Sequence, residues 1–148
     1  MLPLMRFTVQ ATFVIIALAA TGSLAIRKYL DKLPLQLMPY SMASRDAALE
    51  DGQCVLVTIY GNWDVNTADA LRWLSRDVTL RIRRQNIVAM SADWSKHETH
   101  VTALMNELDV KSVPVLAFYA PENPDRPTVI SNLPGENQVL SVIDKCCR

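Results

Sequence analysis

The sequence is poor in residues that would point directly to one chemistry. Its 148 residues contain 15 basic and 15 acidic side chains, so the formal net charge is zero. No overall field therefore points to nucleic acid or to a strongly acidic partner. The chain has only two histidines and three cysteines, and an odd number leaves at least one cysteine outside any intramolecular disulfide of a monomer. The sequence shows no internal repeat and no low-complexity segment.

One long apolar segment stands near the N-terminus. Phe7–Ile26 contains no charged residue, and a helix of about 20 apolar residues matches the hydrocarbon thickness of a bilayer. Three basic residues, Arg27, Lys28 and Lys32, follow the segment, as is typical of a membrane boundary. We therefore predict an N-terminal transmembrane helix within residues 1–30.

Other interpretations of this segment stay open. The small residues at Ser23–Ala25 and the short apolar core at Ala11–Ala20 also fit a cleaved signal peptide. A core helix is disfavoured because the segment has no polar face. The basic residues after the segment favour a cytoplasmic C-terminal domain, although Arg6 and the N-terminal amine oppose that bias.

A tether and one compact domain are predicted to follow. Pro34 and Pro39 disfavour helix and restrict the residues before them, so we predict a tether over residues 31–43. A short helix at Arg45–Glu50 then begins a domain that we predict to span residues 44–148, a length suited to one domain.

Hydrophobic patterning predicts alternating strands and helices in this domain. Continuous apolar runs with β-branched residues indicate strands covered on both faces, and apolar residues at helical spacing indicate amphipathic helices. The predicted strands are Cys54–Tyr60, Ile87–Ser91, Val115–Tyr119 and Thr128–Ser131. The predicted helices are Thr67–Gln85, Glu98–Leu108 and Asn137–Lys145. The first of these helices has a candidate break at Ser75–Asp77. This order predicts an α/β fold with a central sheet and helices on both faces.

Three ordered segments carry a resemblance to a known family. Val55–Thr67, which ends in Trp63-Asp64-Val65-Asn66-Thr67, resembles the active-site region of thioredoxin-like domains. It is most similar to the C-terminal domain of the bacterial membrane thiol:disulfide interchange proteins, some of which read Trp-Cys-Val-Asn-Cys here. Ala92–Ser95 and Val110–Val115 resemble later landmarks of the same group, and Pro114 matches the family's cis-proline. The resemblance implies a thioredoxin-like fold, with a central mixed sheet flanked by helices.

The departures from the family concern its chemistry. Asp64 and Thr67 stand where the family has the two cysteines of its motif. In the family a thiolate attacks a substrate disulfide and a second thiol resolves the mixed disulfide, which neither side chain can do. Thr58 also stands where many members carry a buried acid. We therefore predict a degenerate site without catalytic residues, in which Asp64 and Thr67 cap a helix.

The resemblance also implies a surface for protein binding. In thioredoxin-like proteins the tryptophan loop and the residue before the cis-proline form a groove that pairs with an extended peptide. Trp63, Val113 and Pro114 are the matching positions here. The resemblance therefore implies a protein partner, an extracytoplasmic domain, no cofactor, and a cis peptide bond before Pro114.

The three cysteines lie outside the motif. Cys54 is expected to be a small buried apolar residue at the start of its strand. Cys146 and Cys147 are adjacent, and a disulfide between neighbours is strained because consecutive α-carbons are only about 3.8 Å apart. The tail is either a frayed end without a selected role or an exposed thiol pair for redox sensing, intermolecular bonding or metal capture.

Two further patterns are weak signals. His97 and His100 can present two imidazoles on one helix face, but no third ligand is evident, so surface histidines are the simpler interpretation and no metal is predicted. The arginine-rich region between Arg72 and Arg84 is interpreted as a solvated face. An alternative is a contact with acidic lipid or an acidic partner.

Three hypotheses of function follow. The leading one is a membrane-tethered, redox-inactive thioredoxin-like domain that binds protein within an envelope assembly or a cytochrome-maturation pathway. The competing one is a thiol-disulfide oxidoreductase or redox sensor that uses Cys146 and Cys147. The third is a folded spacer on a membrane anchor. The fold alone does not choose among them.

Overall fold

The computed structural model describes residues 34–62, 73–132 and 134–146. Their helices and strands are, in chain order, β1 (Met38–Pro39), α2 (Met42–Glu50), β2 (Val55–Tyr60), α3 (Arg76–Arg84), β3 (Val88–Asp93), α4 (Thr99–Glu107), β4 (Val115–Tyr119), β5 (Thr128–Ser131) and α5 (Glu136–Cys146). The described residues from Leu35 onward form one compact unit. None of the helices in the described ranges is long and apolar enough to cross a membrane, and the predicted anchor at Phe7–Ile26 lies outside those ranges.

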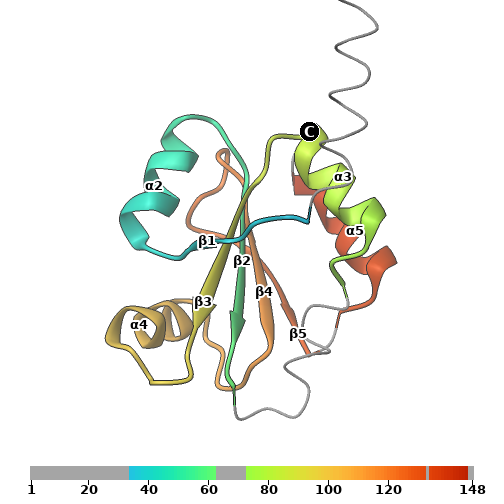
Figure 1. The fold of residues 1–148 in the computed structure, drawn as a ribbon. Coiled ribbons are helices and arrows are strands. Elements are labelled where there is room, and N and C mark those ends of the chain that lie inside the picture. The colour runs from blue at the N-terminus through green and yellow to red at the C-terminus, as the bar shows by residue number, and fades with distance from the viewer. Residues whose placement is uncertain (1–33, 63–72, 133, 147–148) are drawn as a thin grey trace, which may run out of the picture. The chain divides into compact units, whose positions relative to one another are not determined.

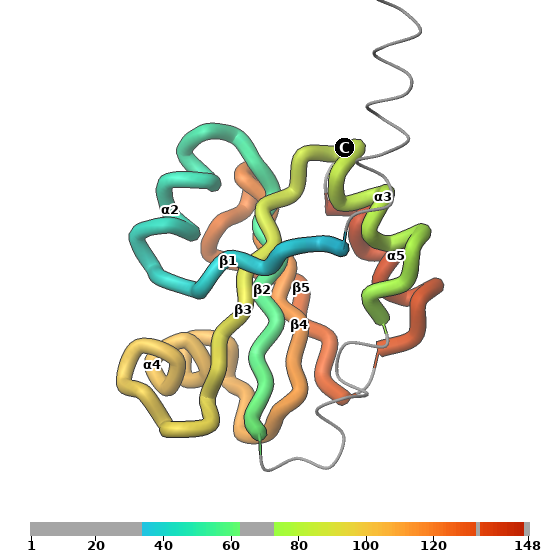
Figure 2. The backbone as a smooth tube through the Cα atoms, in the orientation of Figure 1, coloured from blue at the N-terminus to red at the C-terminus, as the bar shows by residue number. Residues whose placement is uncertain are grey.

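The strands form one mixed sheet in the order β1-β3-β2-β4-β5 (Figures 1 and 2). β1 and β2 both run parallel to β3, whereas β4 is antiparallel to β2 and β5 is antiparallel to β4. The register pairs Ile59 near the end of β2 with Val115 at the start of β4. The carboxyl end of β2 therefore lies beside the segment that leads into β4.

Helices cover both faces of this sheet, α2 and α4 on one side and α3 and α5 on the other (Figure 1). Successive side chains of a strand point to opposite faces. Val55, Val57 and Ile59 of β2 therefore enter the core on the α2 and α4 side, while Leu56 enters the core on the α3 and α5 side. None of these four side chains is more than 1% exposed, which explains why the strand reads as a continuous apolar run.

Serine side chains mark where two of the helices begin. The Ser41 hydroxyl accepts a hydrogen bond from the backbone amide of Ser44 at 3.1 Å, at the start of α2. The Ser75 hydroxyl accepts from the amide of Val78 at 3.2 Å, at the start of α3. Each bond satisfies one of the backbone donors that a helix N-terminus leaves unpaired.

The capping by Ser75 corrects the predicted helix Thr67–Gln85. In the described part of this range the helix begins only at Arg76, and the candidate break is its N-terminus. Trp73 and Leu74 fall within the predicted helix but precede the observed one, although Trp73 is only 1% exposed. Residues 63–72 lie outside the described ranges.

The predicted tether over residues 31–43 also differs from the structure in its described part. Met38 and Pro39 pair with Met90 and Ser91 as β1, the Tyr40 amide donates to the Ser91 carbonyl at 2.8 Å, and α2 already begins at Met42. β1 has only two residues, one of them a proline. A proline at a sheet edge is compatible with pairing on one side, so its presence did not exclude a strand.

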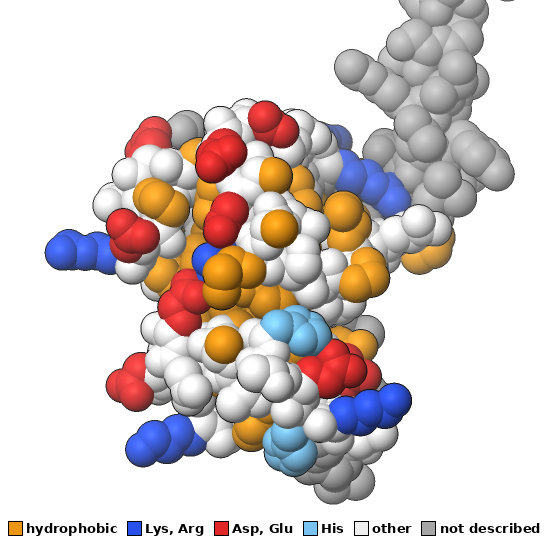
Figure 3. Space-filling view, turned by 90° about the vertical axis from the view of Figure 1, so that its left-hand side faces the viewer, with side chains coloured by type: hydrophobic (Ala, Val, Ile, Leu, Met, Phe, Trp, Pro, Cys, Tyr) orange, Lys and Arg blue, Asp and Glu red, His pale blue; other side chains and the backbone are white. Residues whose placement is uncertain are grey.

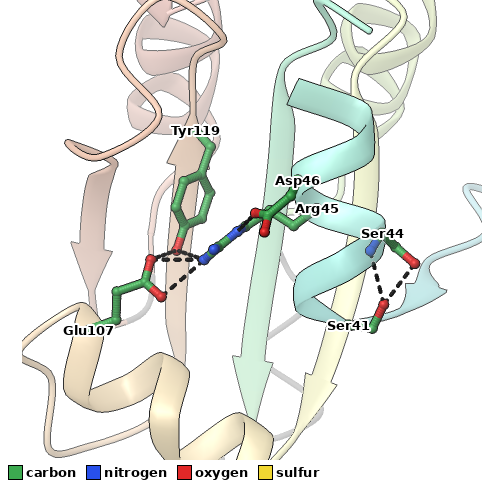
Figure 4. A network of polar contacts seen from close by, with 6 residues as sticks. All are labelled: Ser41, Ser44, Arg45, Asp46, Glu107 and Tyr119. Atoms are coloured by element: carbon green, nitrogen blue, oxygen red, sulfur yellow. Dashed lines mark hydrogen bonds and ion pairs between the residues drawn. The ribbon is translucent and has the colours of Figure 1, made fainter. Parts of the chain in front are cut away.

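A buried arginine joins three elements on the α2 and α4 side (Figure 4). Arg45 of α2 is 9% exposed. Its Nη1 donates to both carboxylate oxygens of Glu107 in α4, at 2.8 and 3.1 Å, and lies 3.5 Å from the Tyr119 hydroxyl in β4. Its Nε donates to Asp46 at 2.9 Å, and the guanidinium carbon lies 5.0 Å from the centre of the Tyr119 ring.

The pKa values of this cluster follow from burial and from the opposite charges. Burial by itself would lower the pKa of Arg45, but the hydrogen bonds to Glu107 and Asp46 outweigh it and raise that pKa above its ordinary value. Burial, with the nearby Glu107 carboxylate, raises the pKa of Tyr119. Arg45 is therefore charged and Tyr119 neutral at physiological pH.

We predict that Glu107→Ala lowers the free energy of unfolding by about 1–3 kcal/mol, because the buried guanidinium of Arg45 loses a carboxylate that offsets its desolvation. Glu107 itself is 39% exposed, which keeps the expected loss below that of a fully buried pair. Urea unfolding followed by tryptophan fluorescence measures the change. Glu122→Ala in an exposed loop is the matched control and should change stability by about 0.5 kcal/mol or less. Equal losses in the two variants would contradict the role of Arg45.

Candidate functional site

The predicted groove residues Val113 and Pro114 lie at the carboxyl end of β2. They directly precede β4, whose first residue, Val115, pairs with Ile59 of β2. The Val113–Pro114 peptide bond is cis, as the family resemblance implied. Both residues are half-buried, and Val113 packs against the core on the α2 and α4 side. Trp63, the third predicted groove residue, lies outside the described residues, as do Asp64 and Thr67.

The loop after β3 is bonded to the loop after β2 at this same end of the sheet. The backbone amide of Asn62 donates to the Ser95 hydroxyl at 2.9 Å, and the Trp94 amide donates to the Tyr60 carbonyl at 2.8 Å. The Ser95 hydroxyl in turn donates to Asp93 in a short contact. These bonds hold the described start of the β2 loop, Gly61–Asn62, against the end of β3.

An ionised carboxylate marks this end of the sheet. Asp93 accepts from the hydroxyl of Ser95 and from its backbone amide, the latter at 2.8 Å. These two bonds hold the pKa of Asp93 below its ordinary value. Burial, with the nearby charge of Asp93, raises the pKa of Tyr60. The site therefore carries a negative charge at neutral pH, on a side chain exposed to solvent.

From the sequence, Ala92–Ser95 was identified only as a family landmark, and the hydrogen bonds among Asn62, Ser95 and Asp93 were not predicted. A carboxylate that accepts from the backbone two residues on is a local turn motif of aspartate, so the Asp93-x-Ser95 pattern was a readable signal for the turn. The bond from Asn62 to Ser95 joins residues 33 positions apart and had no such signal.

Trp94 anchors the connection between β3 and α4. Its indole Nε1 donates to the Thr102 hydroxyl at 3.0 Å, and its ring meets the edge of the His97 ring at a centroid distance of 4.5 Å. His97 has a positive φ of 52°, and its backbone amide bonds to the Trp94 carbonyl at 2.9 Å. The half-buried tryptophan therefore organises a tight turn beside the site.

The two histidines have different neighbours. His97 contacts Trp94, whereas His100 stacks on Tyr40 at a centroid distance of 6.4 Å and lies 3.5 Å from the carboxylate of Glu98. The two pale blue imidazoles lie apart on the face shown in Figure 3. Among the described residues, no group of three or more His, Cys, Asp or Glu side chains is arranged to hold a metal ion.

The described thiols lie at the opposite end of β2 from Pro114. Cys54, which is 8% exposed as predicted, directly precedes β2, and its Sγ lies 3.4 Å from the Cys146 carbonyl oxygen. The Sγ of Cys146 lies 3.6 Å from the Thr128 hydroxyl at the start of β5. β2 has six residues and is about 20 Å long at its usual rise per residue. Cys146 therefore does not join the groove, and Cys147 lies outside the described residues.

Thr58 is fully buried in the middle of β2, at the position where many family members carry an acid. It is 1% exposed and pairs with Ser91 and Leu116 on the two neighbouring strands. A hydroxyl at this place does not ionise in the physiological range. The described core beneath the site therefore has no proton relay at position 58.

Comparison with known proteins identifies the fold. No family model matches the sequence, and no curated protein matches it. Solved structures do match. A thioredoxin variant from Halobacterium salinarum NRC-1 is 18% identical, with a TM-score of 0.55 over 76% of this chain and 90% of that chain. The oxidised C-terminal domain of Neisseria meningitidis DsbD is 11% identical, with a TM-score of 0.57 over 74% of this chain and 98% of that chain. The chain therefore has a thioredoxin-like fold, as the family resemblance of its sequence implied.

Proposed function

We propose that this chain is a thioredoxin-like domain that binds an extended segment of another protein at the Val113–Pro114 end of β2, without thiol exchange. The observation that carries the proposal is the separation of groove from thiols. The groove residues Val113 and Pro114 lie at one end of β2, and the described cysteines lie at the other. Binding therefore does not depend on any described sulfur.

The chemistry of thiol exchange supports the same conclusion. A substrate disulfide is broken by a thiolate, and the mixed disulfide that forms is released by a second thiol. The sequence has aspartate at position 64 and threonine at position 67, and neither side chain can form a mixed disulfide. A chain with this fold and without those sulfurs lacks, at this position, the groups that would reduce a bound polypeptide.

The surroundings of Val113 suit recognition of a polypeptide backbone. Val113 stands outside the regular strands, directly before the proline that precedes β4. An extended peptide whose backbone pairs with such a segment gains affinity from main-chain hydrogen bonds and selectivity from its side chains. The hydrogen bonds among Asn62, Ser95 and Asp93 hold the neighbouring loop in place and so reduce the cost of ordering it on binding.

The proposal includes a membrane tether formed by residues 7–26 and an extracytoplasmic domain in an envelope assembly or cytochrome-maturation pathway. The uncharged apolar length of that segment and the basic residues behind it support the tether. The family resemblance supports the extracytoplasmic position, against the bias of those basic residues. Immunodetection of the full chain in membrane and soluble fractions, with protease protection in sealed vesicles, tests both parts. A domain shielded from external protease in right-side-out vesicles would contradict the proposed orientation.

We predict that the full chain does not reduce an insulin-type disulfide substrate above the background of the added reductant. The double variant Cys146→Ser/Cys147→Ser should behave identically, because the proposed binding uses no thiol. Turbidity from the released insulin chain gives the rate. Turnover lost in the double variant would place the chemistry in the tail, and turnover retained there would place it at Cys54; either result rejects the proposal.

A second prediction concerns peptides selected on the immobilised full chain from a random library. Val113→Ala should weaken binding of such a peptide about 3- to 10-fold, as expected for loss of a buried contact of about 0.7–1.4 kcal/mol. Val129→Ala in β5 is the matched control, because Val129 is also half-buried and packs against the same core cluster. Fluorescence anisotropy gives the dissociation constants.

Methylation of one backbone nitrogen of the peptide provides an independent readout, since it removes a donor from strand-like pairing without changing a side chain. At least one position should lose about 10-fold in affinity. Unchanged affinity in Val113→Ala and in every methylated peptide would favour the folded-spacer interpretation.

A further inference from the structure

A hollow with a volume of ≈ 310 Å³ lies between α2 and the loop that joins β4 to β5. Asp46, Leu49 and Glu50 of α2 line it on one side, and Pro121 and Pro124 of the loop line it on the other. Residues three and four apart share one face of a helix, so these α2 side chains form a continuous wall. Figure 1 shows the orange β4–β5 loop running beside α2.

The loop wall of this hollow is preformed. The Asn123 amide bonds to the Ala120 carbonyl at 3.0 Å, and the Arg126 amide bonds to the Asn123 carbonyl at 3.1 Å. These two turns, with the fixed φ of Pro121 and Pro124, restrict the backbone of the loop. A ligand that enters the hollow therefore meets a wall that needs little ordering.

Negative charge dominates the helix wall. Asp46 is 49% exposed and accepts from Arg45, but the same guanidinium is also bonded to Glu107. One cation thus serves two carboxylates, and Glu50 is exposed and forms no ion pair with another described residue. Figure 3 shows acidic side chains gathered over α2, in the upper part of that face. The hollow therefore combines apolar walls with uncompensated negative charge.

We propose that this hollow binds an arginine side chain of a partner polypeptide. The guanidinium would lie between the carboxylates of Asp46 and Glu50, and the methylene stem would pack on Leu49, Pro121 and Pro124. Arginine fits both halves of the hollow, because its stem covers apolar surface while its charged head hydrogen-bonds carboxylates. Its flat, weakly hydrated head suits an apolar wall better than the compact ammonium of lysine.

This site goes beyond the proposed groove and is separate from it. Pro114 and Pro121 flank the five residues of β4, so the two surfaces lie at opposite ends of that strand, about 20 Å apart. Substitutions at such distances usually act independently. The proposal of an arginine site can therefore hold if the proposal of peptide binding at the groove fails, and the reverse is also true.

The test uses the peptide acetyl-Gly-Arg-Gly-amide and its citrulline analogue, which keeps the shape of the arginine side chain without its charge. Each is titrated into the isotope-labelled full chain, and backbone amide shifts give the position and the strength of binding. The arginine peptide should shift amides of residues 46–50 and of the non-proline residues within 120–126, and the citrulline peptide should bind at least about 5-fold more weakly.

Variants separate this site from general attraction to negative charge. Glu50→Gln should weaken arginine binding at least about 3-fold, whereas Glu136→Gln on α5, which lies on the other side of the sheet, should leave it unchanged. Val113→Ala should also leave it unchanged. The proposal is overturned by equal binding of the two peptides, by shifts confined to other residues, or by an equal effect of the two glutamate variants. Unchanged spectra of the unbound variants confirm that each is folded.

Discussion

The buried guanidinium of Arg45 is the constraint on which the α2 and α4 side of this structure depends. Burying the charge of Arg45 is costly unless opposite charges and hydrogen bonds replace the lost hydration. Glu107 of α4, Asp46 of α2 and the hydroxyl and ring of Tyr119 in β4 supply that replacement. The same contacts join two helices to the sheet. The position of α2 against α4 and β4 therefore follows from the need to satisfy one side chain.

The sheet separates the chemistry of the molecule into two ends. Val113–Pro114 and the Asp93-centred hydrogen bonds lie at the carboxyl end of β2. Cys54 and Cys146 lie at its amino end, as does the hollow beside Pro121, because Tyr119 of β4 pairs with Val55. The proposed polypeptide binding at the first end and the proposed capture of an arginine side chain at the second are compatible, since neither uses a residue of the other. Both proposals require a rigid scaffold more than reactive groups.

Sequence patterns predicted β4 and β5 well, but not the two-residue strand β1 or the start of α3. β4 and β5 have their predicted bounds, because their β-branched and aromatic residues favour strands locally. β1 was missed because its two residues are held by β3, far along the chain. The residues from Trp73 to Ser75 were assigned to a helix because their apolar spacing suited one. Burial of Trp73 and the Ser75 cap decided otherwise.

The sequence by itself determined the order of strands and helices from α2 onward, the thioredoxin-like character and the absence of both motif cysteines, because each follows from residue identity or from short-range periodicity. Only the tertiary structure decided that Arg45 and Glu107, 62 residues apart, share one charge cluster. It alone brought Asn62 to Ser95, placed Cys146 beside Cys54, and set two prolines against the acidic face of α2. These contacts arise from the packing of segments distant in the chain, and no local pattern encodes the distance between such segments.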